Sequence, residues 1–180
     1  MGVADLGPSA VPQNYVCIRS LSMRNSLLRR VSLSAASASA RRYRSTVPAG
    51  GKVFESADAA VADMRAGAKL LVGGFGLTGV PENLLAAIKK KGIRNLEVVS
   101  SNVGTAERGL GLLFQDKQIS KMVGSYVGEN DLFESQFLNG EIDVELVPMG
   151  TLAERMRAAG AGIPAFFTAT GVGTLVHHGR

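Results

Sequence analysis

Short apolar runs alternate along residues 49–180 with segments whose apolar residues recur at helical spacing, and this alternation limits the fold more than any other feature. The runs expected as strands are 69–73, 96–100, 122–126, 144–147 and 165–168. The segments expected as helices are 56–64, 81–91, 110–115, 131–138 and 151–159. Strands that alternate with helices predict an α/β domain with a mainly parallel sheet and helices on both faces.

Two helices carry start signals. Pro81 stands in the first turn of its helix, with Glu82 near the positive end and three lysines, 89–91, near the negative end. Thr151 and Glu154 have the spacing of a capping box, which predicts a helix start at Thr151.

Ligands of a parallel sheet bind at the carboxyl ends of its strands. These ends are expected at 73–79, 100–104, 148–150 and 170–173, and all four are rich in Gly, Ser, Thr or Asn. We therefore expect the functional site at this edge.

Residues 1–48 have a different composition from the rest of the chain. They hold seven Arg and one acid, Asp5, whereas residues 49–180 are nearly neutral, so the net charge of +5 gives little support for nucleic-acid binding. From Met23 this leader is rich in Arg, Ser and Ala and free of acids, which is typical of a mitochondrial presequence. We expect a disordered leader, a working start at Met23, removal around 43–46 and the mitochondrial matrix as destination. A basic tail without a targeting role is the alternative.

The sequence gives no support for several kinds of functional site. The single cysteine, Cys17, lies in the leader, so residues 49–180 offer no disulfide, thiol nucleophile or cysteine metal site. His177 and His178 have no metal-ligand partners at a recognisable spacing, so no metal is expected. No apolar run reaches the roughly 18 residues of a membrane helix, and neither a membrane nor a nucleic-acid partner is expected.

The stretch KLLVGGFGLTGVPENLLAAI contains G-x-G-x-x-G at Gly74, Gly76 and Gly79. A dinucleotide-binding turn starts its helix inside the glycine run, whereas Pro81 delays this helix until after the third glycine. Such a site also needs an acid at the tip of the second strand, but here Glu97 lies inside that strand. NAD binding is therefore a minor alternative. The glycines either bring backbone N–H groups close to a ligand or only permit tight turns.

Four stretches carry a family resemblance: GAKLLVGGFGLTGVPENLL, NVGTAERGLGLL, KMVGSYVGEN and FLNGEIDVELVPMGTLAERMRAAGAGIPAFFTATGVGTLV. They resemble the class I CoA-transferases, in particular the A half of the succinyl-CoA:3-ketoacid CoA-transferase family. The resemblance implies a NagB/RpiA-like A domain over 49–180, incomplete at its C-terminus. It also implies transfer of CoA from succinyl-CoA, or another acyl-CoA, to a short-chain acid such as a 3-oxoacid or acetate. CoA is then a substrate, and no permanently bound cofactor is expected.

In that family a glutamate carboxylate attacks the acyl-CoA, and a glutamyl-CoA thioester forms. The resemblance places this glutamate in a B half, so no catalytic residue is expected in this chain, which should be inactive alone. The expected partners are the B half or a separate B subunit, acyl-CoA, short-chain carboxylates and further copies in a homo-oligomer. The alternative is a truncated, non-catalytic α/β module that binds CoA or a partner.

The residues expected to line the CoA and substrate site are Gly74, Phe75, Gly76, Gly79, Ser101, Asn102, Met149 and Gly150. Asn102 either binds a carboxylate or serves a turn. Ketoacid-type members usually carry Gln where this chain has Met149, and many carry Asn where it has Ser101. Met149 has no N–H to donate, which favours an acetate:succinate or related short-chain preference, with neutral drift as the alternative.

Overall fold

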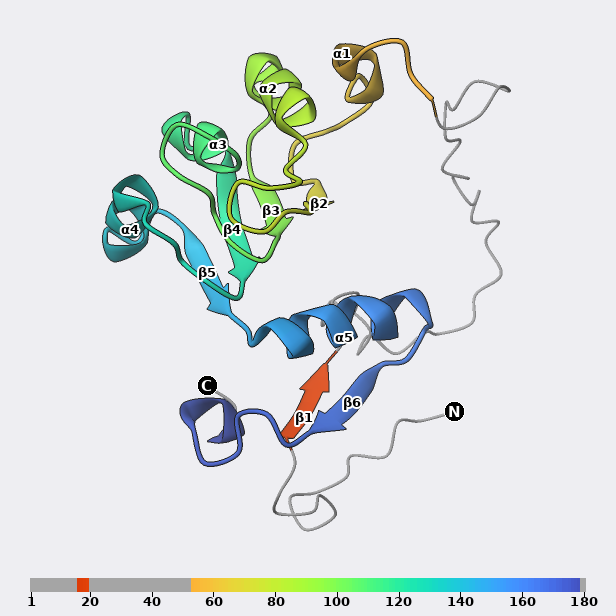
Figure 1. Ribbon diagram of the computed structural model, residues 1–180, viewed down its shortest axis with the longest axis vertical. Coiled ribbons are helices and arrows are strands. Elements are labelled where there is room, and N and C mark those ends of the chain that lie inside the picture. Colours follow the sequence, from red (N-terminus) through yellow and green to blue (C-terminus); the bar gives the residue numbers. More distant parts are fainter. Residues whose placement is uncertain (1–15, 20–52, 179–180) are drawn as a thin grey trace, which may run out of the picture.

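The computed structural model describes residues 16–19 and 53–178, and its main feature is a four-stranded parallel sheet flanked by helices (Figure 1). The strands, in their spatial order, are β2 (Lys69–Leu71), β3 (Leu96–Val99), β4 (Ile119–Gly124) and β5 (Asp143–Leu146). The helices are α1 (Ala57–Ala60), α2 (Glu82–Lys91), α3 (Gly111–Gln115), α4 (Asp131–Leu138) and α5 (Met149–Gly160). The predicted α/β class is confirmed.

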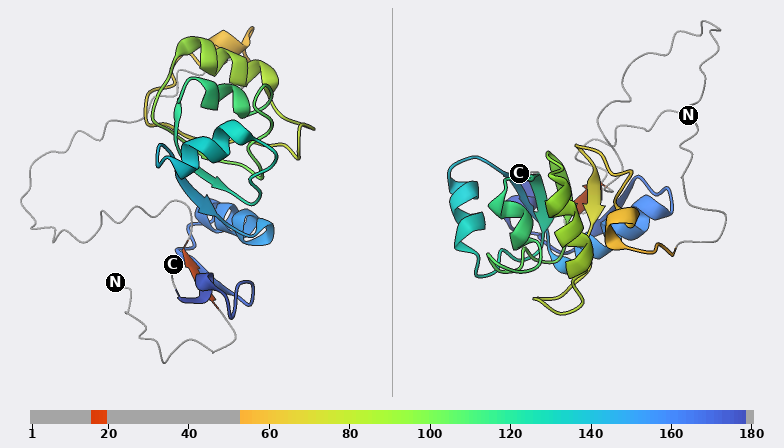
Figure 2. Two further views of the ribbon diagram at one scale, coloured as in Figure 1. Left: turned by 90° about the vertical axis from the view of Figure 1, so that its left-hand side faces the viewer. Right: turned by 90° about the horizontal axis from the view of Figure 1, so that it is seen from above.

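Helices cover one face of this sheet, and α5 contacts the other face near the carboxyl ends of the strands. α2, α3 and α4 lie side by side on one face (Figure 2), as right-handed crossovers between sequential neighbouring strands require. The larger core lies on that side and includes Val98, Leu113, Phe114, Met122 and Phe133. α5 packs on the other face near the carboxyl ends, where Val99, Val123 and Leu152 form a smaller core. Successive side chains of a strand point to opposite faces, so β3 and β4 each supply both cores.

The α5 face of the sheet also carries a row of alternating charges. Lys69, Glu97, Lys121 and Asp143 stand in register on the four neighbouring strands. Lys69 Nζ lies 2.8 Å from Glu97 Oε1, and Lys121 Nζ lies 3.1 Å from Asp143 Oδ2. Opposite charges on directly paired residues stabilise a sheet. Glu97 thus stabilises the pairing of β2 with β3, in agreement with its position inside the strand.

Side chains from later segments bond the carbonyl groups at the ends of three helices. Lys91 Nζ donates to three backbone carbonyls in and after the C-cap of α1. The buried Gln118 donates to two carbonyls around the end of α2, and the buried Gln136 donates to the carbonyl of Phe114 in α3. Helix ends leave such carbonyls without intrahelical partners. The end of each of these helices is therefore hydrogen-bonded to a segment that comes later in the sequence.

Two predicted helix boundaries are wrong. The helix expected at 56–64 forms only as α1, capped by Ser56, and turns follow it. The last helix begins at Met149, directly after Pro148, and not at Thr151. Thr151 is buried in the first turn, and Glu154 bonds Arg157, so the two residues form no capping box.

The last predicted strand, β6 (Ala165–Thr168), does not join the parallel sheet. It pairs antiparallel with β1 (Val16–Arg19), because α5 carries the chain away from the edge of the main sheet (Figure 1). Residues 170–173 therefore do not lie at the carboxyl edge of that sheet, and their predicted place among the ligand loops is wrong. The chain continues into a short 3-10 helix, η2 (Leu175–His178).

The strand β1 lies inside the segment 1–48 that was expected as a disordered leader. The expectation does not hold for Val16–Arg19, which pair residue by residue with β6. The predicted working start at Met23 and removal around 43–46 lie outside the described residues.

Candidate functional site

Two tight turns stand at the carboxyl edge of the sheet, after β2 and after β3. In the first, Phe75 and Thr78 exchange backbone hydrogen bonds of 2.9 and 3.0 Å. In the second, Thr105 and Arg108 face each other in the same antiparallel way. Two neighbouring parallel strands thus end in similar hairpin turns, which the sequence places about 30 residues apart and the sheet brings side by side.

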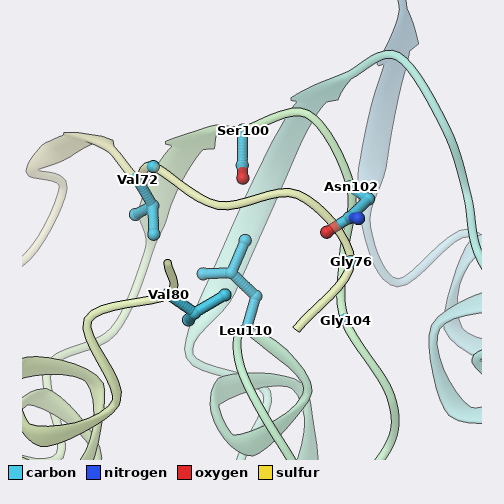
Figure 3. A pocket seen from close by; sticks show the side chains of 8 residues that line it. Val72, Gly76, Val80, Ser100, Asn102, Gly104 and Leu110 are labelled. Carbon is cyan, nitrogen blue, oxygen red and sulfur yellow. The ribbon is translucent and has the colours of Figure 1, made fainter. Parts of the chain in front are cut away.

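A small pocket lies between these turns. It is lined by Val72, Gly73, Gly76, Val80, Ser100, Asn102, Gly104 and Leu110. Figure 3 shows the side chains of Val80 and Leu110 facing the Ser100 hydroxyl, with the Asn102 amide beside Gly76 and Gly104. The volume is about 10 Å³, roughly the space that one water molecule needs. A cavity of this size is too small to enclose a substrate.

Two glycines of the first turn are required by its geometry. Gly74 has φ +138°, and a Cβ there would lie 2.7 Å from Val80 Cγ2. Gly76 has φ +59°, in the left-handed region that favours glycine. Within the ranges 16–19 and 53–178, no protein group accepts a hydrogen bond from the N–H of either glycine. Turn formation thus explains these glycines, and it leaves two N–H groups available to a ligand.

Ser101, in the loop after β3, forms hydrogen bonds with the loops after β2 and β4. Its hydroxyl donates to the carbonyl of Gly74 at 2.6 Å, which fixes the loop after β2 against the loop after β3. Its own carbonyl accepts from the N–H groups of Ser125 and Tyr126, at 3.1 and 3.0 Å, in the loop after β4. Ser101 lies beside the pocket and acts on its shape through the backbone.

The structure brings only part of the predicted set to the pocket. Gly76 and Asn102 line it, whereas Gly79 closes the first turn with φ +74° and lies outside the lining. Phe75 is 85% exposed at the tip of the same turn.

The other two predicted residues lie further along the sheet edge. Met149 and Gly150 begin α5, after β5. Met149 Sδ accepts a hydrogen bond from Ser125 Oγ at 3.5 Å, and its side chain is half exposed. Both residues lie outside the pocket lining.

Sequence reasoning missed the apolar side of the pocket. Val80 and Leu110 each follow a glycine that ends a hairpin turn, Gly79 and Gly109. The repeated Gly–apolar pair after the two turns is the signal that could have identified them.

Asn130, in the loop after β4, was also missed as a neighbour of the site. Asn130 is buried there; its Oδ1 accepts from the N–H of Phe133 and caps α4. Its Nδ2 donates to the carbonyl of Gly104 at 3.4 Å, in the pocket lining. The same side chain therefore starts a helix and supports the pocket.

No metal centre or membrane span is found in the part of the chain that the structure describes. It has no group of three His, Cys, Asp or Glu side chains able to hold an ion, and no helix long and apolar enough to cross a bilayer. His177 Nδ1 accepts from the N–H of Gly173 at 3.2 Å, and the ring stacks on His178.

Comparisons with known proteins agree on one family. The family model described as Coenzyme A transferase matches residues 54–180. The A subunit of a probable succinyl-CoA:3-ketoacid coenzyme A transferase of Bacillus subtilis is 57% identical over 130 residues, which cover 72% of this chain and 55% of that protein. The human succinyl-CoA:3-ketoacid coenzyme A transferase 2, mitochondrial, is 58% identical over 119 residues, which cover 66% of this chain and 23% of that protein.

A solved structure supports the fold alone. A variant of the decarboxylase AibA/AibB matches with a TM-score of 0.52 and 23% identity, over 61% of this chain and 44% of that chain. The chain spans about half the length of the bacterial relatives that it matches, and less of the human one.

Proposed function

Because the chain belongs to the coenzyme A transferase family, we propose that it is the A portion of an enzyme that moves CoA from succinyl-CoA to a 3-oxoacid. The observation that carries this proposal is the 57% identity with a protein named as the A subunit of such a transferase. The family match spans all four parallel strands and the loops at their carboxyl ends. CoA is a substrate in this proposal, and no permanently bound cofactor is needed.

The glycine turn is proposed to bind the reacting oxygen atoms. The N–H groups of Gly74 and Gly76 have no acceptor within the described ranges, so they can face a thioester carbonyl or a carboxylate. A donor to a developing oxyanion is typically worth about 3 kcal/mol. The Asn102 amide, beside Gly76 in the pocket, would hold the carboxylate of the acid.

The remaining residues are proposed to extend this wall. Gly79 and Gly150 let the backbone approach CoA closely, and Phe75 and Met149 offer apolar contact from exposed positions. Ser101 keeps Gly74 in place through its 2.6 Å hydrogen bond.

The nucleophile is proposed to come from a B portion outside this chain. Among the residues that the structure describes, no carboxylate lines the pocket. A glutamate of the B portion would attack the acyl-CoA carbonyl and release CoA thiolate. The thiolate then attacks the glutamyl carbonyl of the resulting anhydride, which releases the donor carboxylate and leaves a glutamyl-CoA thioester. Homo-oligomer formation and a mitochondrial matrix location complete the proposal. The location rests on the composition of residues 23–48 and on the mitochondrial human relative, although bacterial relatives are equally similar.

Mixing the full chain with the B subunit of a bacterial relative tests this function. We expect CoA transfer from succinyl-CoA to acetoacetate in the mixture and not with either protein alone, and a CoA adduct on the B subunit by mass spectrometry. Acetate as a competing acceptor measures the effect of Met149. Association without transfer would favour the non-catalytic alternative, and tighter calorimetric binding of NADH than of CoA would contradict the proposal.

Replacing Asn102 tests the binding site separately. Asn102→Ala removes the amide from the pocket, so we expect KM for the acid to rise by about tenfold, the effect of roughly 1.4 kcal/mol. Asn102→Asp places a negative charge against the substrate carboxylate and should raise KM further. Equal KM values for both variants and the unchanged chain would assign Asn102 to the turn alone.

A further inference from the structure

We propose that Glu82 is a positioning residue whose carboxylate clamps the turn after β3 onto the turn after β2. The contact itself is read from the structure, and its role in CoA transfer rests on the proposed function. Glu82 stands directly after Pro81 as the first residue of α2, where an acid commonly stabilises the positive helix end.

The side chain of Glu82 reaches beyond its own helix. Its Oε2 accepts a hydrogen bond from the N–H of Gly109 at 3.3 Å, across 27 residues of sequence. Its Oε1 is buried without a hydrogen-bond partner among the described residues, and Arg108 Nε lies 3.9 Å away. A surface acid that only complements a helix end needs no buried oxygen, so the orientation of this carboxylate points to the neighbouring loop.

The Glu82 contact joins the two sides of the pocket. Val80, two residues before Glu82, lines one side, and Leu110, directly after Gly109, lines the other. A Cβ added at Gly109 would lie 3.7 Å from the side chains of both Leu77 and Val80, so the two turns are neighbours with room for about one methyl group between them at this point. The hydrogen bond therefore joins the two turns directly at a point where side-chain packing leaves some space.

The Glu82 contact would set the relative position of the groups proposed to face the ligand. The first turn carries Gly76, with its available N–H, and the second begins at Gly104 beside Asn102. A displacement of about 1 Å in a positioning element can lower a rate by up to about 100-fold. Releasing the clamp should therefore reduce turnover more than binding.

Four variants of the full chain, assayed with a B subunit, test this role. Glu82→Ala removes the acceptor and should lower kcat about tenfold or more, with KM within about threefold. Glu82→Gln keeps an acceptor oxygen at the same reach and should restore most of kcat. Glu82→Asp keeps the charge at the helix end but withdraws it from Gly109, so it should behave like the alanine variant. Glu154→Ala is the matched control, because among the described residues Glu154 pairs only with Arg157, on its own helix α5.

Unchanged kcat in Glu82→Ala, or equal loss in the alanine and glutamine variants, would overturn the proposal. If the alanine variant does not fold, the comparison of the aspartate and glutamine variants decides the same point. A loss in glutamine but not in aspartate would mean that the charge matters and the reach does not, which also overturns it.

Amide hydrogen exchange at Gly109 tests the clamp without any activity. In the full chain alone, the Gly109 N–H should exchange about tenfold faster or more in Glu82→Ala, and remain protected in Glu82→Gln and Glu154→Ala. Unchanged protection in Glu82→Ala would overturn the clamp. If the unsubstituted chain transfers no CoA with any B subunit, the proposed function fails, and this exchange measurement still decides whether the contact exists.

Discussion

Glycines in this chain differ widely in whether a larger side chain would fit in their place. Gly111 and Gly160 both lie in helices without a positive φ. A Cβ on Gly111 would lie 1.6 Å from the carbonyl oxygen of Thr105, whereas a Cβ on Gly160 would meet nothing within 4 Å. The packing of α3 under the second turn therefore requires glycine at position 111 for steric reasons alone.

The same substitution at these two glycines should have opposite effects. Gly111→Ala overpacks the turn after β3 and should lower the free energy of unfolding by about 1–3 kcal/mol or more. Gly160→Ala should raise it by up to about 0.5–1 kcal/mol, because alanine favours helix. Urea unfolding of the full chain measures both changes. Similar shifts for the two variants would contradict the steric argument.

The pair of Glu154 and Arg157 predicts a pH effect. Hydrogen bonds from Arg157 lower the pKa of the Glu154 carboxyl below its ordinary value, and Glu154 raises the pKa of Arg157. A carboxyl with a lowered pKa stabilises the folded chain at neutral pH, and this contribution is lost as pH falls through that pKa. An NMR titration should show a lower Glu154 pKa in the unsubstituted chain than in Arg157→Gln. Equal values would show that solvent screens this exposed pair completely.

Helices and parallel strands could be predicted because their signals are local. The helix at 131–138 agrees with α4 residue for residue, since Asn130 caps it and Asn139-Gly140 ends it. The antiparallel pairing of β6 with β1 could not be predicted, because it joins segments about 150 residues apart. The glycine turn was likewise predicted from adjacent residues. The pocket was not, because its two sides meet only through the register of β2 and β3.

The long-range hydrogen bonds at the helix ends could not be predicted from the sequence either. Gln118 is 1% exposed, and its Nε2 donates to the carbonyls of Ile88 and Ile93 at 3.3 and 2.9 Å. Nothing in the local pattern around Gln118 distinguishes it from Gln115, which is exposed. Gln115 also forms hydrogen bonds, to Lys89 and to the carbonyl of Ala106, so only the packing shows which of the two glutamines is buried.

Replacing these two glutamines should separate their roles. Gln118→Leu leaves two buried carbonyls without this donor and should cost about 1–3 kcal/mol of unfolding free energy. Gln115→Leu removes hydrogen bonds to Lys89 and Ala106 that are exposed to water, so it should change this free energy by about 0.5 kcal/mol or less. Denaturant midpoints at unchanged slope are the measurement. A Gln118→Leu variant as stable as the original chain would mean that water replaces the donor.

The whole chain exposes large apolar side chains. Phe75, Tyr126, Leu138 and Leu175 are 85%, 64%, 81% and 70% exposed. Exposed apolar groups mark surfaces that contact other molecules when they gather in patches. Phe75 and Tyr126 both lie in loops at the carboxyl edge of the sheet, beside the pocket.

We expect the chain alone to self-associate, and a B subunit to suppress this. Light scattering with and without that subunit tests the expectation, and Phe75→Ser with Tyr126→Ser should reduce the association. A stable monomer of 18.8 kDa across a range of concentrations would contradict it.

The small volume of the pocket has a consequence for hydrolysis of the acyl-CoA, a reaction that would compete with transfer. A thioester resting against an open wall with room for about one water would be accessible to solvent, so hydrolysis would compete with transfer. The residues that line the pocket do not enclose such a thioester by themselves. The ratio of transferred to hydrolysed acyl-CoA should therefore depend on how tightly other parts of the enzyme cover this edge, and it would measure closure independently of the overall rate.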